Sequence, residues 1–392
     1  MNLILIKIGK AWSVIKREGI FRGGKRVLEG FFSIFNFVGS GDVLFITGGV
    51  VAGDSTRFRV LNVMEELEAQ GFHCSRTVQD NPFLAGYAKK FKIFIFHRVL
   101  FTPNVSKLID EIKSQNREII FETDDLVFDP QYLPYMDYFQ KMNSLERKMY
   151  ENGVGGEILV DPYVKVCTTT TSYLAKKLEE KNKRVFIIPN KLSISDLKIA
   201  EEILAAEATK KDETVRLGYF SGTASHNKDF ATITEALYQI MQKYEKLELF
   251  LAGPLDIENK LNDFKNRIKQ ISHVPREKHF ANIFSVDINL APLEINNPFC
   301  EAKSELKFFE AGIVMVPTVA VKNQTFSEAI SDGVDGLLAL ETQEWVEKLS
   351  LLIESKEMRD AIGNKAYEKS LEKYTTKNSH NQEYYNYLKA KL

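Results

Sequence analysis

The sequence predicts an α/β fold with two Rossmann-like domains that face a central cleft. The chain has 392 residues, which is more than one ordinary domain core accommodates. Short apolar runs alternate with helical patterns from residue 42 onward, the order of βαβ units around a parallel sheet. This alternation occurs separately on either side of a polar, charged stretch at residues 193–213, which we expect to connect the domains. Ligands of such sheets bind at the carboxyl ends of the strands.

The first domain is expected to span residues 40–192. An apolar stripe of one residue per helical turn, followed by a glycine, indicates a helix over 57–70. Strands are expected at 42–47, 92–97, 118–122, 165–168 and 184–188.

The second domain is expected to span residues 214–374 and to repeat the same order of elements. The Tyr-rich tail at 375–392 is expected to form one more helix. Strands are expected at 215–220, 247–252, 287–291 and 314–320, with helices at 230–244, 342–354 and 356–373.

Composition excludes several classes of protein. Lys and Arg total 52 against 53 for Asp and Glu, whereas nonspecific nucleic-acid binding needs a basic excess, so no nucleic acid is expected as a partner. Cys74, Cys167 and Cys300 lack paired spacing, which argues against a disulfide framework and a thiolate zinc site. We therefore expect no thiolate metal site and a reducing, cytoplasmic setting.

The N-terminal residues 1–39 are expected to form a helical extension. They lack the order of a signal peptide, and their apolar runs are too short to span a bilayer. The extension either packs on the body of the protein or lies on an anionic membrane at the inner face of the plasma membrane. Its basic residues include Lys16, Arg17, Arg22, Lys25 and Arg26, and its aromatic residues include Trp12, Phe21, Phe31 and Phe32.

The most informative segment, residues 296–312, places two lysines and a glutamate on one face of a predicted helix. The helix is expected to begin near Ser304, and Lys303, Lys307 and Glu310 follow one another at steps of four and three residues. Free N–H groups at a helix start and two ammonium groups suit a diphosphate, and a carboxylate suits two ribose hydroxyls. The alternative is a surface helix on which Lys307 and Glu310 pair with each other.

A second segment, residues 218–230, has the order strand, polar turn and helix. The turn contains Gly222 and Thr223 and is followed by Lys228. A glycine in a turn before a helix lets a ligand approach the backbone closely. His226 is expected either to contact a phosphate or a sugar or to cap the turn.

Both segments resemble the donor site of the retaining GT-B glycosyltransferases called glycosyl transferases group 1. The resemblance implies that Glu310 binds the nucleotide ribose and that Lys228 contacts a donor phosphate. It also implies that the glycine turn and the N–H groups at the helix start surround the diphosphate. The residues implied for the nucleotide-sugar are Gly222, Thr223, Lys228, Ser304, Glu305, Leu306, Lys307 and Glu310.

Two positions depart from the family pattern. Ala302 stands where the family's E-x(7)-E pattern has its first glutamate, with Glu301 displaced by one residue. Thr223 stands where an arginine is common. We expect Lys303 or Lys307 to supply the missing positive charge, because a leaving nucleoside diphosphate develops negative charge and this fold commonly lacks a metal.

The first domain offers candidate acceptor and sugar contacts. A glycine-bearing loop with Gly49 precedes Arg57 and Arg59, which either bind an anionic acceptor or pair with nearby carboxylates such as Glu65. His97 ends an apolar strand, in the region where the resembled family places a histidine that binds the donor sugar.

A carboxylate cluster follows the next strand and supports a rival interpretation. Glu122, Asp124 and Asp125 could form the metal site of a single-domain GT-A transferase. The phosphate-type motifs lie in the other half of the chain, however, and the pattern divides into two units. Asp124 and Asp125 are therefore expected to bind acceptor hydroxyls or to fix the loop.

The sequence as a whole predicts a metal-independent hexosyltransferase. The acceptor is expected to be a cell-surface polysaccharide or a glycolipid, and the resemblance implies retention of the anomeric configuration. A catalytically degenerate GT-B protein that binds sugar or acts as a scaffold is the alternative, motivated by Ala302 and Thr223. The expected catalytic residues are Lys228, Lys303, Glu310 and His97.

Overall fold

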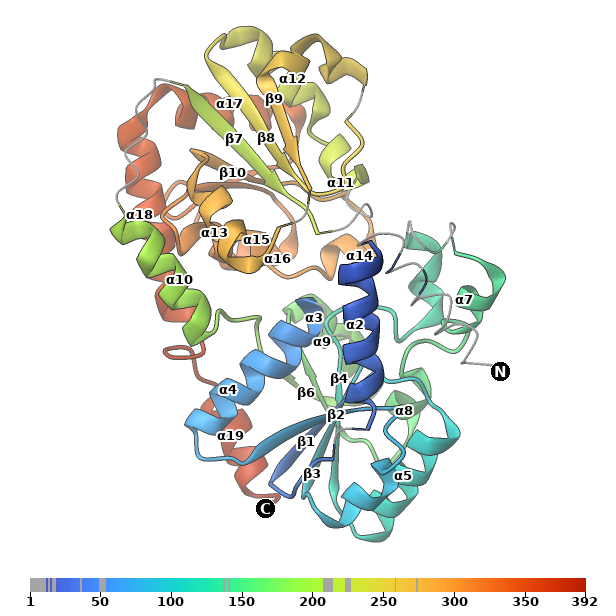
Figure 1. Cartoon of the computed structure of the whole chain (residues 1–392). Helices are drawn as coiled ribbons and strands as arrows, with labels where there is room; N and C mark the ends of the chain where they lie inside the picture. Colours follow the sequence, from blue (N-terminus) through green and yellow to red (C-terminus); the bar gives the residue numbers. More distant parts are fainter. Residues whose placement is uncertain are drawn as a thin grey trace. The chain divides into compact units, whose positions relative to one another are not determined.

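The structure, a computed structural model, divides the chain into two compact units (Figure 1). Unit 1 comprises Met1–Pro189 and His380–Leu392, and unit 2 comprises Asn190–Ser379. The chain therefore enters unit 2 after Pro189 and returns to unit 1 after Ser379. The described residues are 12, 15, 19–35, 37–48, 54–136, 139, 142–206, 214–222, 227–257, 259–272 and 274–392.

Unit 1 contains a six-stranded parallel sheet in the order β2-β1-β3-β4-β5-β6. The inner strands are almost wholly buried, as expected for a parallel sheet with helices on its faces. Strand order reverses at β1, which pairs with β2 on one side and β3 on the other. The strands are β1 (Val43–Thr47), β2 (Cys74–Val78), β3 (Ile93–His97), β4 (Glu118–Glu122), β5 (Val166–Thr169) and β6 (Arg184–Ile187).

The helices of unit 1 begin at residues suited to capping. Thr102 accepts the N–H of Val105 at the start of α5, and Thr171 accepts the N–H of Leu174 at the start of α9. The α-helices are α2 (Ile20–Ser33), α3 (Asp54–Thr56), α4 (Asn62–Ala69), α5 (Pro103–Ser114), α7 (Ser144–Lys148), α8 (Gly156–Val160), α9 (Ser172–Glu179) and α19 (Gln382–Lys389). A π-helical turn covers Arg57–Leu61, and 3-10 helices cover Leu84–Lys89 and Pro130–Tyr135.

The last helix, α19, completes the core of unit 1. Tyr384, Tyr385 and Leu388 are buried in the same apolar cluster as strands β1 and β3. The Tyr385 hydroxyl donates to the buried carboxylate of Glu66. The core of unit 1 is thus built from both ends of the chain (Figure 1).

Unit 2 contains a second six-stranded parallel sheet, in the order β12-β11-β10-β7-β8-β9. Strand order reverses at β7, which pairs with β8 on one side and β10 on the other. The strands are β7 (Val215–Phe220), β8 (Leu247–Ala252), β9 (Ile268–Ile271), β10 (Ile288–Ala291), β11 (Thr318–Val321) and β12 (Leu337–Ala339). The helices are α10 (Ile194–Ala205), α11 (Asn227–Ala231), α12 (Thr234–Lys243), α13 (Arg276–Phe284), α14 (Pro298–Glu301), α15 (Leu306–Gly312), α16 (Gln324–Ala329), α17 (Thr342–Glu354) and α18 (Lys356–Lys373), with a 3-10 helix at Asn259–Arg267.

The stretch 193–213, expected as a connection between domains, contains helix α10 as part of unit 2. Ser193 and Asp196 form a capping box: the Ser193 hydroxyl accepts the Asp196 N–H, and the Asp196 carboxylate accepts the Ser193 N–H. This reciprocal pair starts the helix four residues after the chain enters unit 2. Residues 207–213 lie outside the described part of the chain.

The predicted α/β fold with two sheets is confirmed, and a single-domain GT-A fold is excluded. Three edge strands, β2, β9 and β12, were not predicted. The helix expected at 57–70 opens with a π-helical turn, and the strand expected at 314–320 begins only at Thr318. Within the described residues, no helix combines the length and apolar character that a membrane span requires.

Candidate functional site

The strand order of unit 2 places its candidate site where β7 and β10 end. In an open α/β sheet, the crevice for a ligand lies beyond the carboxyl ends of two neighbouring strands whose connections leave in opposite directions. The segment after β7 contains Gly222 and leads to α11, and the segment after β10 leads to α14 and α15. Both segments singled out in the sequence therefore meet at this edge of the sheet. Thr223 and His226 lie outside the described residues.

Lys307 reaches the end of β7 from helix α15. Its ammonium group donates to the carbonyl oxygen of Phe220, the last residue of β7, and lies 4.8 Å from the ring centroid of Tyr219. Burial lowers the pKa of Lys307 to about 8, against the raising effect of the Glu310 carboxylate. Lys307 therefore places a cation beside the switch point of the sheet.

Glu310 lies one turn further along α15 and is buried. Its carboxylate accepts a hydrogen bond from the Arg276 guanidinium and lies 3.2 Å from Nε2 of His279, both on α13. Burial opposes ionisation, but Arg276 and His279 lower the pKa of Glu310 to about 2. Arg276 Nε also donates to Asp196 Oδ1 at 2.8 Å. The carboxylate of Glu310 is therefore charged at neutral pH.

The pairing of Lys307 with Glu310 that a plain surface helix would show does not form. Glu310 pairs with α13, and Lys307 bonds to a strand carbonyl. Lys307 and Glu310 thus lie on the same helix but have separate partners, and Lys303 precedes the helix.

The remaining predicted donor residues surround the same edge. Lys303 Nζ lies 2.6 Å from Asp229 Oδ2, and Lys228 is exposed on α11. The Ser304 hydroxyl accepts from the Asn190 side chain at 2.9 Å. Glu305 precedes the first residue of α15, and burial raises the pKa of its carboxyl group to about 7. Leu306 begins the helix, two residues later than the sequence suggested.

In unit 1, His97 belongs to a buried network at the ends of β3 and β4. Its Nε2 lies 2.9 Å from the Ser55 hydroxyl, which donates to Asp124 Oδ2 at 2.8 Å. Its Nδ1 lies 3.7 Å from Glu122 Oε1. His97 is the last residue of β3, beside the reversal of strand order at β1, so its backbone position is that of a ligand-site residue.

The interpretation of Arg59 as an acceptor contact is wrong. Arg59 is only 1% exposed, because the π-helical turn directs its guanidinium into the interior. There it makes two hydrogen bonds to Glu122, of 2.8 and 2.9 Å, and one of 2.6 Å to the carbonyl of Ile188. Glu122 is thus a carboxylate partner of Arg59. Arg57 is half-buried, and Gly49 lies outside the described residues.

The carboxylates considered for a metal are paired with arginines. Glu122 pairs with Arg59, while Asp124 and Asp125 both pair with the guanidinium of Arg98. Burial opposes the charge on Asp124, but Arg98 holds its pKa well below the usual range. This arrangement fixes the loop after β4, which was one of the two roles expected for Asp124 and Asp125.

The sequence did not reveal the residues that form hydrogen bonds with the predicted site residues Glu310 and Lys303. Arg276 and His279 lie 34 and 31 positions before Glu310, and Asp229 lies 74 positions before Lys303. Packing of α13 against α15 brings Arg276 and His279 to Glu310, and the pairing of β7 with β10 brings Asp229 to Lys303. The adjacency of Asp229 to Lys228 was the one available signal.

Comparisons with known proteins agree with this architecture. Residues 233–382 match the family described as "Glycosyl transferase-like". HepE from Anabaena, solved with UDP and glucose, is 13% identical with a TM-score of 0.56, covering 86% of this chain and 96% of that chain. Sucrose-phosphate synthase from Thermosynechococcus elongatus is 14% identical with a TM-score of 0.59 and the same coverage. A glycosyltransferase from Rickettsia africae is 12% identical with a TM-score of 0.60, covering 88% and 98%. No curated protein matches the chain significantly.

The two parallel sheets and these neighbours define the class: the chain has the fold of the GT-B glycosyltransferases. Within that class, residues 233–382, which make up most of unit 2, match the model of the glycosyl transferase-like family. The predicted GT-B fold is thereby confirmed, and the predicted resemblance to a glycosyltransferase family is matched over residues 233–382.

Proposed function

We propose that the chain is a glycosyltransferase whose unit 2 binds a nucleoside-diphosphate sugar at the ends of β7 and β10. The observation that carries the proposal is the charge arrangement on one short segment. Lys303 and Lys307 present cations near the switch point, and Glu310 presents a carboxylate one turn further along α15. HepE, which shares the fold, was solved with UDP and with UDP-glucose, so UDP-glucose is the first donor to test.

The proposed chemistry divides these side chains by charge. The diphosphate gains negative charge as the bond to the sugar breaks, and preset ammonium groups stabilise that charge without reorganising. Lys228, Lys303 and Lys307 are the proposed cations. Glu310 accepts from the ribose hydroxyls, since a carboxylate offers about four lone-pair sites and two donors already occupy part of them.

The finer features of the reaction belong to the same proposal. We propose a hexosyl transfer that needs no metal, with His97 contacting the donor sugar and with retention of configuration. In that case the departing diphosphate takes the proton of the acceptor hydroxyl, and no dedicated protein base is required. Arg57, Asp124 and Asp125 are the proposed acceptor-side residues.

The donor experiment combines binding with turnover. UDP-, GDP- and dTDP-sugars are screened for thermal stabilisation, since a ligand at 100 times its Kd adds about 2.7 kcal/mol to the free energy of unfolding. Free nucleotide released from the best donor is then measured, with Lys307→Met as the variant and Lys365→Met, on the exposed surface of α18, as the control. Stabilisation by none of the donors would refute the proposal.

The alternative function, a sugar-binding or scaffold protein without catalysis, rests on Ala302. This residue replaces the first glutamate of the family pattern and is buried, and its methyl side chain offers no hydrogen-bonding group to a sugar hydroxyl. A pure binder would be stabilised by a donor and release no nucleotide. Slow nucleotide release by the wild-type chain, abolished in Lys307→Met, favours the enzyme.

We also propose that the acceptor is a cell-surface polysaccharide or glycolipid, met at the cytoplasmic face of a membrane. Helix α2 supports a membrane contact: Ile20 is 79% exposed, Phe21 is 93% exposed, and Lys25 and Leu28 are exposed on the following turns. Apolar side chains beside basic ones on an exposed helix are typical of helices that lie in the interface of an anionic bilayer. Lys16 and Arg17 lie outside the described residues.

The membrane contact is tested by co-sedimentation with phosphatidylglycerol vesicles. Each basic residue near an anionic surface contributes about 1 kcal/mol, and this attraction is screened by salt. We expect the full chain to sediment at low salt and to be released at high salt, and a chain lacking residues 1–39 to stay in the supernatant with its donor binding intact. If the full chain also stays in the supernatant at low salt, the membrane proposal fails.

A further inference from the structure

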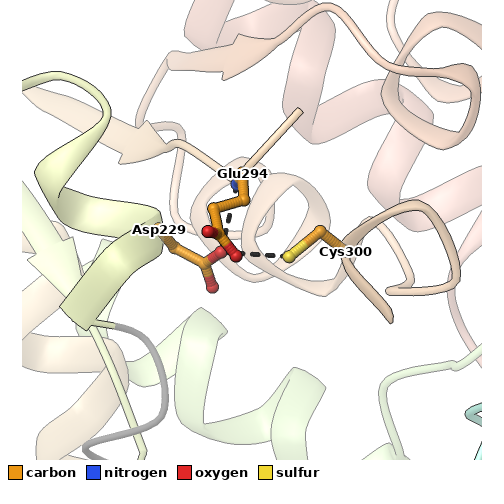
Figure 2. Close-up of side chains that lie close together, drawn as sticks. All are labelled: Asp229, Glu294 and Cys300. Atoms are coloured by element: carbon orange, nitrogen blue, oxygen red, sulfur yellow. Dashed lines mark hydrogen bonds between the residues drawn. The ribbon is translucent and has the colours of Figure 1, made fainter. Parts of the chain in front are cut away.

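A single buried carboxylate, that of Asp229, joins the two segments that form the candidate donor site. Asp229 lies on α11, after β7, and its Oδ1 accepts the backbone N–H of Glu294 at 3.2 Å. The same oxygen lies 3.2 Å from the sulfur of Cys300, and Oδ2 accepts from Lys303 at 2.6 Å. Glu294, Cys300 and Lys303 all belong to the segment between β10 and α15. Figure 2 shows the contacts of Glu294 and Cys300 with the Asp229 carboxylate.

The chemistry of the cluster identifies Lys303 as its cation. Asp229, Glu294 and Cys300 bring one potential metal-ligand atom each within 4.8 Å of one another. Burial raises the pKa of the Cys300 thiol to about 12, so the thiol keeps its proton and donates to Asp229. A thiol binds a metal as the thiolate. The Lys303 ammonium already neutralises the Asp229 carboxylate. Glu294, Cys300 and Lys303 therefore hold Asp229 through hydrogen bonds.

The segment between β10 and α15 is also stabilised by hydrogen bonds of its own Asn297 side chain. Asn297 Oδ1 accepts the N–H of Phe299 at 3.0 Å and caps α14, while Asn297 Nδ2 donates to Glu294 Oε1 at 2.7 Å. A lysine side chain ordinarily loses much rotamer freedom when it is immobilised on a ligand. In this segment the Asp229 contact fixes the ammonium beforehand, although the Lys303 side chain remains 31% exposed.

We propose that Asp229 is a positioning residue that orients the Lys303 ammonium for the diphosphate of the donor. This inference rests on the proposed function. Asp229 holds Lys303 and the segment after β10 against the segment after β7, so that the phosphates meet a cation of fixed position. Asp229 itself acts through Lys303 and touches no phosphate.

A double-mutant cycle on UDP binding tests the inference. Asp229→Asn keeps the shape of the side chain and removes the charge that holds Lys303, and Lys303→Met removes the cation. We expect each single variant to weaken UDP binding about tenfold and to raise the KM for UDP-glucose. Because both act through one contact, the double variant should bind UDP within about twofold of Lys303→Met. Effects that multiply in the double variant would overturn the inference.

The chain offers a matched control in the same unit. Asp335 is also buried and also lies 2.6 Å from a lysine Nζ, that of Lys369. Asp335→Asn should lower the thermal stability of unit 2 and leave UDP affinity unchanged. Equal losses of UDP affinity in Asp335→Asn and Asp229→Asn would reduce Asp229 to a general structural role and overturn the inference.

A second pair of variants keeps the inference testable if Asp229→Asn does not fold. Lys303→Arg retains the charge and the reach to Asp229, so it should keep most of the UDP affinity, whereas Lys303→Gln should lose about tenfold. Equal affinity of Lys303→Gln and the wild type overturns the inference. Absence of UDP binding by the wild-type chain would instead refute UDP as the ligand of the proposed function, so the two failures are distinguishable.

Discussion

Replacing Glu310 by glutamine removes the charge between α15 and α13 while nearly preserving the shape of the side chain. Arg276 then loses its charged partner Glu310 and keeps the hydrogen bond from its Nε to Asp196. Breaking a buried ion pair from one side costs about 3 to 5 kcal/mol. The pKa of Glu310, which falls from 4.5 to about 2, gives an independent figure of about 3 kcal/mol. We therefore expect Glu310→Gln to lower the free energy of unfolding of unit 2 by about 3 kcal/mol at pH 7.

The lowered pKa of Glu310 also makes the destabilisation by Glu310→Gln depend on pH. The folded state lowers the pKa of Glu310, so its stabilising contribution is fully present above pH 4.5 and is lost as the pH falls toward 2. The difference between the wild type and Glu310→Gln should therefore be constant from pH 5 to 7 and shrink to about half by pH 3. Donor binding should weaken in the same variant, because the ribose hydroxyls lose a charged acceptor.

The assay uses the one tryptophan of unit 2. Of the two tryptophans in the chain, Trp345 is buried in unit 2, and Trp12 can be replaced by phenylalanine. Urea unfolding followed by Trp345 fluorescence then reports on unit 2, with Glu368→Gln, in an exposed pair on α18, as the control. A difference in unfolding free energy that does not change between pH 5 and 3 would refute the assigned ion pair.

Three further results are expected. Nucleotide-sugar turnover should persist in excess EDTA, and activity that is abolished by EDTA and restored by manganese would contradict the proposed metal independence. Arg59→Met should destabilise unit 1 by about 3 to 5 kcal/mol in thermal or urea unfolding, whereas Arg57→Met, at a half-buried position, should change it by less than about 1 kcal/mol; similar losses would contradict the assigned burial. Gly312→Ala should cost about 1 to 3 kcal/mol, because the new Cβ would lie 2.3 Å from the Ser370 hydroxyl, whereas Gly24→Ala meets open space and should be neutral or stabilising. An unchanged unfolding midpoint for Gly312→Ala would show that α15 and α18 can separate at this point.

The central strands could be predicted from the sequence, and most edge strands could not. A central parallel strand is buried on both faces and reads as a continuous apolar run, as in Val43–Thr47 and Leu247–Ala252. The edge strands Cys74–Val78 and Ile268–Ile271 are partly exposed and contain polar residues, so they carry no such signal. The strand expected from residue 314 was delayed because the left-handed Met315 (φ 59°) and the following Pro317 do not fit a strand interior.

The candidate site divides in the same way. Residues that share a helix, such as Lys307 and Glu310, could be placed together from their spacing alone. Partners on other elements could not, because Arg276 and Asp229 reach them only through the strand order of unit 2. Arg59 was misinterpreted because its partners Glu122 and Ile188 lie 63 and 129 positions further along the chain.

The return of the last thirteen residues to unit 1 has a consequence for how the molecule is made. The sheet of unit 1 leaves the ribosome first, yet Tyr384, Tyr385 and Leu388 enter its core only after all of unit 2 has been synthesised. Unit 2 is continuous in sequence and can fold as soon as it emerges. Because the chain is synthesised from its N-terminus, unit 2 is complete before unit 1. Until α19 has been synthesised, the apolar residues of unit 1 that it covers stay without their partners.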